Sequence, residues 1–445
     1  MKSRQLSGCV AALAVALGSW ACGEDEPLGG GASGGSGGSG ASGGSGGSGG
    51  SSASGGSGGA GGSEAGLGGS SGSGGSDGGL APGLLLTAAT DFFSTTELAV
   101  VDLATNTVTQ RVDVTDGDAV PRASRGRGFL LARSSSEVVV VGKTTATPVI
   151  DVGHAAIGTT GTGSTNPSDV VASGDDAFVF LYDVNRIAVA SLTTGQIAST
   201  IVLDDLLDTG DGDGAIELGN ATYDPKSDRF YFIAGRIDRT TIAPPNYELA
   251  CSAAPALLLA LDPTSKTLVD LNGSAPGTGV DLSLKNPVDM VLDPVNDRLL
   301  VLSAGCFAAS EAGTARSAYG VTAVSLSGLS EDPLLLPTSG DYLARLLLLG
   351  SGQAIINGFD ANFAEYWHLW TTTSSSLGAS LAAVPTGATF EAGTSLLGLS
   401  FQTLEGGTSV EVVRYDTATQ NHSTVLSDPF LGSLGFAAGS VVVQP

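Results

Sequence analysis

Positively charged residues are scarce in this chain. Its 445 residues include 19 lysines and arginines against 44 aspartates and glutamates, which gives a formal net charge of −25 at pH 7. Binding to nucleic acid requires basic side chains that neutralise phosphates, so the composition argues against a nucleic-acid partner. An acidic surface favours cations and cationic polymers or peptides as partners. The alternative is that the acidity only keeps the protein soluble.

Histidine, cysteine and helical periodicity are scarce as well. The three histidines, His154, His368 and His422, and the four cysteines show no zinc-ligand spacing. No segment sustains the apolar periodicity of an amphipathic helix. These absences argue against a structural zinc module and against a helical domain.

The first 21 residues have the parts of a secretory signal. A basic tip precedes an apolar stretch from Cys9 to Trp20, and a small-x-small cleavage site ends at Ala21. The apolar stretch is shorter than the ~20 residues that a membrane-spanning helix needs. We therefore predict an exported protein with residues 1–21 as its signal peptide.

Cys22 directly follows this site, at the position where bacterial lipoproteins carry their acylated cysteine. The segment therefore resembles a lipoprotein signal, although Ser19 and Trp20 stand where that family prefers an aliphatic residue and a small or aliphatic one. The resemblance implies a lipid on Cys22, and Gly23, which is not the Asp that retains lipoproteins at the inner membrane, implies the outer membrane. The alternative is ordinary secretion into the periplasm or the medium.

The cysteine count agrees with lipidation. If Cys9 is lost with the signal and Cys22 is acylated, as the resemblance implies, Cys251 and Cys306 are left as a pair. In an exported protein the simplest state of such a pair is a disulfide. Closing a loop of 55 residues (306 minus 251) would stabilise the fold by about 4 kcal/mol in the chain-entropy model.

Residues 22–80 are predicted to be a lipidated N-terminus and a disordered linker. From about Leu28 to Gly79 the chain is nearly all Gly and Ser, with almost no apolar side chains to bury. A Gly/Ser coil of roughly 50 residues spans ~40 Å on average. We interpret the segment as a passive spacer between a membrane and a folded domain.

Residues 81–445 show the pattern of an all-β domain, with short runs of Val, Leu, Ile and Phe between turn-forming residues. One repeated unit consists of an apolar strand, a turn with Asp, Thr or Gly, and a second strand; it occurs at 98–108, 187–197, 257–268 and 412–420. A second unit, an Asp-Pro turn leading to Asp-Arg and a strand, occurs at 223–233 and again 69 residues later at 292–302.

Repeats of this kind, with several strands each, predict a β-propeller. We predict seven blades, with six or eight as alternatives, at residues 83–115, 120–152, 166–204, 216–273, 286–338, 341–385 and 387–428. The remaining piece, 434–444, is expected to complete the first blade. Such closure removes the exposed sheet edges that promote aggregation.

The apolar strand that leads into an Asp-x-x-Thr or Thr-Gly turn resembles the bacterial extracytoplasmic propellers of the YVTN and quinoprotein-like kind. The resemblance covers residues 81–445 and implies the propeller fold. The motif is too general to imply a substrate or a site.

The densest acidic segment, residues 204–217, contains alternating acidic residues followed by a glycine, which is the spacing of a calcium loop. The predicted calcium ligands are Asp208, Asp211, Asp213 and Glu217. Asn220 stands where such a loop places its bidentate Glu. The alternative is a solvated acidic loop without a metal.

Two insertions, at 235–256 and 305–319, each follow the second strand of a blade and each carry one cysteine of the predicted pair. We expect them to lie side by side as a ligand platform, or only to stabilise each other. His154 opens a glycine-rich connection that lacks the lysine of a phosphate-binding loop. The aromatic segment 365–370 is expected to pack in the core; the alternative is a sugar-stacking patch.

These features predict a membrane-tethered extracytoplasmic propeller that serves as a binding or interaction module for a protein, peptide or glycan of the bacterial envelope. The alternative is a metal-dependent hydrolase or lactonase with its metal at the propeller axis. Carboxylates and a histidine that converge on the axis would favour the enzyme. We assign no catalytic residue and no cofactor beyond calcium, and we expect a monomer.

Overall fold

The computed structural model describes residues 83–91, 94–142, 148–207, 212–243, 248–250, 253–273, 278–306, 318–337, 342–350, 352–360, 364–404, 407–430 and 438–443. The predicted signal peptide, Cys22 and the Gly/Ser linker lie outside these ranges. Within them, no helix has both the length and the apolar character needed to cross a membrane.

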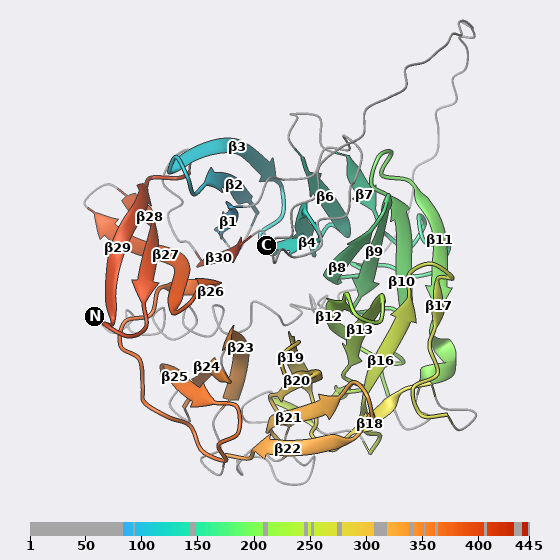
Figure 1. Ribbon diagram of the computed structural model, residues 1–445. Helices are drawn as coiled ribbons and strands as arrows, with labels where there is room; N and C mark the ends of the chain where they lie inside the picture. The colour runs from blue at the N-terminus through green and yellow to red at the C-terminus, as the bar shows by residue number, and fades with distance from the viewer. Residues whose placement is uncertain are drawn as a thin grey trace, which may run out of the picture. The chain divides into compact units, whose positions relative to one another are not determined.

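In the described residues the strands form eight antiparallel sheets, and seven of them are arranged around a central axis (Figure 1), which confirms the predicted seven-bladed β-propeller. From the axis outward, blade one consists of β30 (Ala438–Val443), β1 (Leu84–Thr90), β2 (Thr96–Asp102) and β3 (Thr107–Val114). Blade two consists of β4 (Ala119–Ser124), β5 (Arg127–Ala132), β6 (Glu137–Val141) and β7 (Val149–Asp151). Blade three consists of β8 (Pro167–Ser173), β9 (Asp176–Leu181), β10 (Arg186–Ser191) and β11 (Ile197–Val202).

In the same order, blade four consists of β12 (Leu218–Asp224), β13 (Arg229–Ala234), β16 (Ala256–Asp262) and a split fourth strand, β17 (Thr267–Leu268) with β18 (Val280–Leu282), and blade five consists of β19 (Pro287–Asp293), β20 (Arg298–Ser303), β21 (Gly320–Ser325) and β22 (Glu331–Leu335). Blade six consists of β23 (Tyr342–Gly350), β24 (Gln353–Phe359) and β25 (Glu365–Thr371). Blade seven consists of β26 (Thr386–Ala392), β27 (Ser395–Leu404), β28 (Gly407–Asp416) and β29 (Asn421–Ser427). A hairpin, β14 (Asp238–Ala243) with β15 (Glu248–Ala250), extends from blade four, and a short 3-10 turn, η1 (Asp204–Leu206), follows β11.

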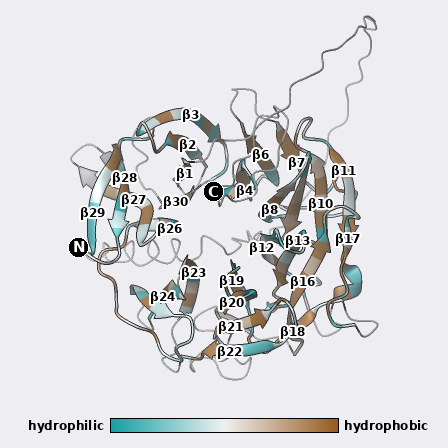
Figure 2. Ribbon diagram, viewed as in Figure 1, coloured by the Kyte–Doolittle hydropathy of each residue, from teal (hydrophilic) through white to brown (hydrophobic). Residues whose placement is uncertain are grey.

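Each pair of neighbouring blades shares its own cluster of buried apolar side chains. A blade therefore buries both faces, and its middle strands are continuous apolar runs rather than alternating ones. Strand β16, for example, is buried from Ala256 to Leu261. The outermost strands β22 and β29 show extended hydrophilic colour (Figure 2).

The ring closes through the C-terminal strand. Strand β30 pairs with β1 in antiparallel register, from Leu85 opposite Val443 to Thr90 opposite Ala438. This confirms the prediction that the C-terminal piece completes the first blade. Blade six is the exception among the seven, because its described part has three strands; beyond them the segment 378–381 bonds to β25 without being a full strand.

The repeated sequence units are the turns of the blades. In the outer hairpins of blades one, four and seven, the turn aspartate accepts hydrogen bonds from the backbone N–H groups two and three residues later; these aspartates are Asp102, Asp262 and Asp416. In the Asp-Pro turns, Asp224 and Asp293 cap the backbone between the first and second strands in the same way. These local bonds explain why Asp recurs at fixed offsets from the strands.

Candidate binding face at the mouth of the propeller

Two kinds of connection meet at one end of the propeller, which we call the mouth face. One kind leads from one blade to the next, and the other joins the second and third strands of a blade. In blades three, four and five, the two kinds of connection are hydrogen-bonded to each other. In each case a backbone N–H directly after the second strand donates to a carbonyl of the connection that leads into the blade. These bonds are Tyr182 to Asn166 at 2.9 Å, Gly235 to Glu217 at 3.0 Å and Ala304 to Asn286 at 2.9 Å. Both predicted insertions start here, directly after β13 and β20.

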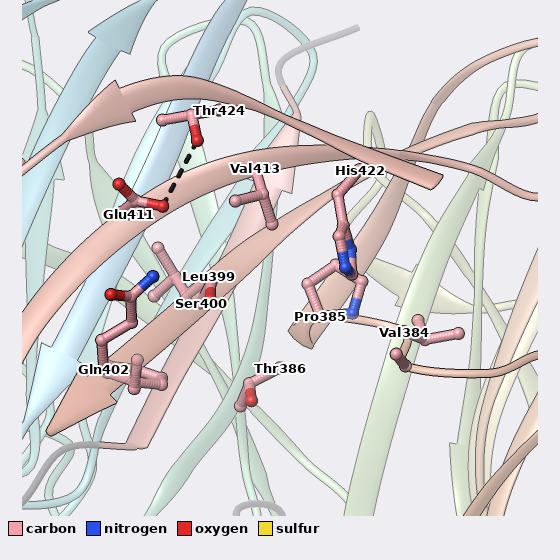
Figure 3. A pocket seen from close by; sticks show the side chains of 12 residues that line it. Val384, Pro385, Thr386, Leu399, Ser400, Gln402, Glu411, Val413, His422 and Thr424 are labelled. Carbon is pink, nitrogen blue, oxygen red and sulfur yellow. Dashed lines mark hydrogen bonds between the residues drawn. The ribbon is translucent and has the colours of Figure 1, made fainter. Parts of the chain in front are cut away.

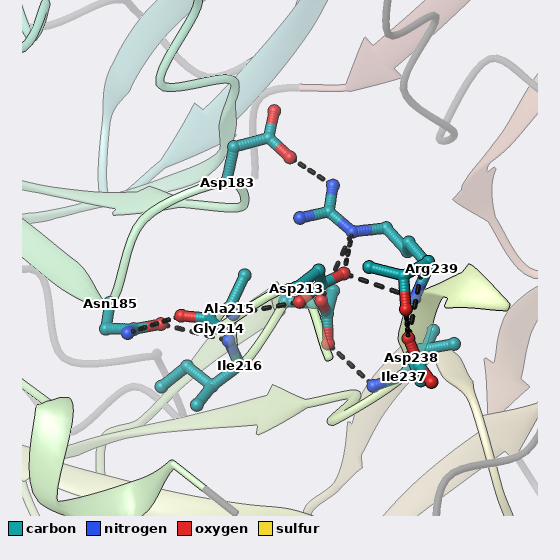
Figure 4. A network of polar contacts seen from close by, with 11 residues as sticks. Asp183, Asn185, Asp213, Gly214, Ala215, Ile216, Ile237, Asp238 and Arg239 are labelled. Atoms are coloured by element: carbon teal, nitrogen blue, oxygen red, sulfur yellow. Dashed lines mark hydrogen bonds and ion pairs between the residues drawn. The ribbon is translucent and has the colours of Figure 1, made fainter. Parts of the chain in front are cut away.

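Arg239, on strand β14 of the blade-four insertion, is the centre of a polar network at this face (Figure 4). Its guanidinium pairs with Asp183, with Asp213 at 2.7 Å and with Glu217 at 3.3 Å. It also lies 5.3 Å from the centre of the Tyr182 ring. Asp183 belongs to blade three, whereas the other two carboxylates belong to the connection into blade four. One arginine of the insertion therefore links three segments.

Charge and burial set the protonation states in this network. Burial acts to lower the pKa of Arg239, but the neighbouring carboxylates, Asp183 foremost, outweigh it and raise the pKa above its ordinary value. Burial raises the pKa of the Tyr182 hydroxyl, so this group stays protonated.

Further hydrogen bonds fix the connection between blades three and four to both of these blades. The Asn185 side chain of blade three donates to the Gly214 carbonyl at 3.0 Å and accepts from the Ile216 N–H at 3.0 Å. The Glu217 carboxylate accepts from the Ile237 N–H at 2.7 Å. The segment from Gly214 to Glu217 is thus held at both ends by side-chain bonds to backbone.

The structure brings together two of the four predicted calcium ligands. Asp213 and Glu217 both pair with the guanidinium of Arg239, while Asp208 and Asp211 lie outside the described residues. Among the residues that are described, no group of three or more His, Cys, Asp and Glu side chains is arranged to hold a metal ion. Calcium binding stays a prediction. Sequence reasoning missed Arg239, because it lies 26 residues after Asp213 and in no recognisable motif.

Polar side chains on the inner strands connect successive blades around the axis. We call Arg122, Asp169, Asn220, Asp289 and Arg345 the inner belt. The guanidinium of Arg122 lies 3.2 Å from the Asp169 carboxylate, and the Asn220 amide donates to Asp289 at 2.7 Å.

The inner belt also reaches backbone groups of the next blade. Asp169 accepts from the Ala221 N–H at 2.8 Å, Asp289 accepts from the Leu346 N–H at 2.7 Å, and Arg345 donates to the Ala388 carbonyl at 3.0 Å. Together with the side-chain pairs, these bonds link blades two to seven.

The belt carboxylates are held by blade-to-blade contacts. Burial raises the pKa of Asp169 and of Asp289, against the opposing effects of arginines and backbone N–H groups. Burial likewise lowers the pKa of Arg345. The two carboxylates of the belt do not converge with a histidine, and each already accepts hydrogen bonds. This arrangement differs from the converging carboxylates and histidine that would favour an enzyme.

The predicted disulfide is described at one end only. Cys306 is buried, with 2 % of its surface exposed, and Cys251 lies outside the described residues, so the bridge stays a prediction. Lys285 lies between the two insertions: its backbone N–H donates to the Ala318 carbonyl at 2.9 Å and its ammonium donates to the carbonyl of Ala254. This places the ends of the two insertions close together, as predicted.

The other two candidates serve packing. The His154 ring bonds to the Thr159 hydroxyl at 2.9 Å within its own connection, which folds over the ring at Gly161. In strand β25, Trp367 and Trp370 are both buried, but in different clusters: the first toward blade seven and the second toward blade five. The expectation that this aromatic segment is core is confirmed.

Comparisons with known proteins assign no activity to the chain. No protein-family model matches the chain, and no curated protein matches it. Similar solved structures include the dihydro-heme d1 dehydrogenase NirN, with 11 % identity, a TM-score of 0.47 and coverage of 81 % of this chain and 75 % of that one. A putative 6-phosphogluconolactonase from Bacteroides uniformis has 12 % identity and a TM-score of 0.47, with coverage of 81 % and 99 %. TolB from Acinetobacter baumannii has 10 % identity and a TM-score of 0.40, with coverage of 82 % and 67 %. Identities of this size transfer no function to the chain.

Proposed function

We propose that the protein is a membrane-tethered, extracytoplasmic propeller that binds a protein, peptide or glycan of the bacterial envelope on its mouth face. The observation that carries this proposal is the Arg239 network, which fixes the blade-four insertion to blade three and to the connection between the blades. A surface that is already ordered loses less conformational entropy on binding, which favours affinity.

The inner belt supports a binding role over hydrolysis. A metal-dependent hydrolase or lactonase needs carboxylates that are free to hold its metal. Asp169 and Asp289 instead accept hydrogen bonds from the next blade. In this proposal the lipid on Cys22 tethers the domain through the Gly/Ser linker, and the disulfide between Cys251 and Cys306 joins the two insertions.

Site-specific photo-crosslinking in intact cells that produce the full chain tests the binding face. A photoreactive amino acid at Thr240, exposed on the insertion, should yield crosslinked envelope components, whereas the same residue at Thr264, exposed in an outer turn of blade four, should not. Products from Thr264 alone, or from neither position, would refute the mouth face. Lactone hydrolysis that requires a divalent metal and is lost in Asp289→Asn would instead establish the enzyme.

The tether is tested separately by intact mass and detergent partitioning of the wild type and of Cys22→Ala. We expect an acylated mass and a detergent-phase protein that both disappear in the variant. A water-soluble, unmodified wild type would show secretion without a lipid.

A further inference from the structure

A cavity of about 490 Å³ lies beside blade seven, apart from the mouth-face network. Its walls are the last residues of the connection from blade six, 383–386, and side chains of strands β27, β28 and β29 (Figure 3). Cavities of about 300–1,000 Å³ are typical of small-molecule sites. The volume therefore suits a small organic ligand.

The cavity exists because the apolar contact between blades six and seven ends early. On the face of blade seven that packs against blade six, the cross-strand pair Leu396 and Tyr415 is buried in the shared apolar cluster. Further along the same face comes the pair Ser400 and Glu411, which is polar and lines the cavity. Blade six lacks a full fourth strand in its described part, so its connection covers this face in place of a sheet.

Glu411 carries the negative charge of the cavity wall. Its carboxylate is half-buried and accepts hydrogen bonds from the hydroxyls of Thr424 at 3.3 Å and Ser427 at 3.2 Å. In the part of the chain that the structure describes, no lysine or arginine pairs with it. Two long bonds from neutral hydroxyls compensate a charge poorly, so a cation placed here gains a charge-assisted hydrogen bond.

The rest of the wall complements a cation with an aliphatic body. The Ser400 hydroxyl and the Gln402 amide oxygen can accept hydrogen bonds near Glu411 (Figure 3). Pro385 and Val413 add apolar surface, and the His422 ring stands at the other end of the cavity in that view. An ammonium group at Glu411 with methylene groups along the apolar wall would satisfy both parts.

We propose that this cavity, the blade-seven pocket, binds a small organic cation that carries a primary ammonium group on a short aliphatic chain. The proposal is independent of the mouth face, with which the pocket shares no residue, and either one can fail without the other.

Calorimetric titration of the purified full-length chain tests the pocket with putrescine and with butanediol, its uncharged counterpart. Putrescine should bind and butanediol should not. Glu411→Gln should weaken putrescine binding about 10-fold or more, the usual effect of losing a charge-assisted hydrogen bond. Glu137→Gln, which removes the same charge from strand β6 of blade two, is the matched control and should bind as the wild type does.

A second variant, Ser400→Leu, fills the cavity while it leaves Glu411 in place, and it should also abolish binding. Circular dichroism checks that each variant is folded. Equal binding of butanediol and putrescine would overturn the cationic ligand class. Putrescine binding that survives both Glu411→Gln and Ser400→Leu would place the ligand elsewhere, and no binding by the wild type would overturn the pocket as an amine site.

Discussion

Replacing Arg239 by alanine should destabilise the protein strongly, because it leaves several carboxylates without their shared cation. The side chain of Glu217 is 1 % exposed and that of Asp213 is 12 % exposed, so water cannot take over the role of the guanidinium. Removing one partner of a buried ion pair costs about 3–5 kcal/mol. Arg239 and Asp183 each keep 24 % exposure, which reduces the effect. We expect a loss of about 3 kcal/mol for Arg239→Ala.

Urea unfolding at neutral pH, followed by circular dichroism, measures this loss from the transition midpoint and slope. Glu217→Gln alone and in combination with Arg239→Ala completes a double-mutant cycle. The cycle should give a coupling of about 1–3 kcal/mol, because the two groups are in contact. Lys226→Ala is the comparison: Lys226 pairs with Asp297 at 2.7 Å, but its side chain is 72 % exposed, so little change is expected.

The reasoning fails if Arg239→Ala loses less than about 1 kcal/mol, which is the range of an exposed ion pair. It also fails if the effects of the two substitutions in the cycle simply add. Either result would mean that the insertion is not fixed by this network, and it would remove the main support for a pre-ordered mouth face.

Three further outcomes are expected. Trp370→Ala should cost about 3–5 kcal/mol in urea unfolding, the usual range for a large buried aromatic side chain, because Trp370 is fully buried; a loss below about 1 kcal/mol would contradict this. Burial raises the pKa of Asp289. The protonated Asp289 carboxyl therefore contributes fully to the free energy of unfolding below the ordinary carboxyl pKa of about 3.9, and this contribution is lost as pH rises through the raised pKa. The wild type should therefore lose stability relative to Asp289→Asn from acidic to neutral pH, and the opposite trend in a series of urea midpoints would refute this. Truncation after residue 430 removes β30 and exposes the edge of β1, so light scattering should show aggregation; a monomeric truncated chain would contradict that expectation.

The fold could be predicted from the sequence because its signals are local and repeated. Asp102, Asp262 and Asp416 each bond to the backbone two and three residues ahead, so the same few letters mark the same outer turn in different blades. The predicted blade windows therefore match the observed sheets, except that the window of blade four ends at residue 273 and misses β18 (Val280–Leu282). In blade six the strands end at Thr371, and the rest of the predicted window includes the segment 378–381, which bonds to β25 through the Leu369 N–H to the Ala379 carbonyl at 2.9 Å and the Leu381 N–H to the Trp367 carbonyl at 2.7 Å.

The site could not be predicted, because its contacts join residues that are distant in sequence. Arg239 and Asp183 are 56 residues apart and lie in different blades. Acidic spacing alone suggested a metal where the chain places a guanidinium beside Asp213 and Glu217. The inner belt did leave a signal: Asn220 and Asp289 are 69 residues apart, the same interval as the two Asp-Pro turns. They are equivalent positions in neighbouring blades, and the repeat could have identified the pair.

The contacts between blades also decide where a ligand has room. Apolar clusters fill the junctions, and the inner belt connects the inner strands of blades two to seven, so most of the propeller interior is already occupied by its own side chains. The belt ends where Arg345 reaches the Ala388 carbonyl, at the junction of blades six and seven. The apolar cluster of that junction also ends early, at Leu396 and Tyr415. Beyond that point the wall is polar, and Glu411 is found there, with long hydrogen bonds from the hydroxyls of Thr424 and Ser427. The early end of the apolar packing makes this junction suitable for a ligand, because a ligand can supply the charge and the apolar contact that blade six does not.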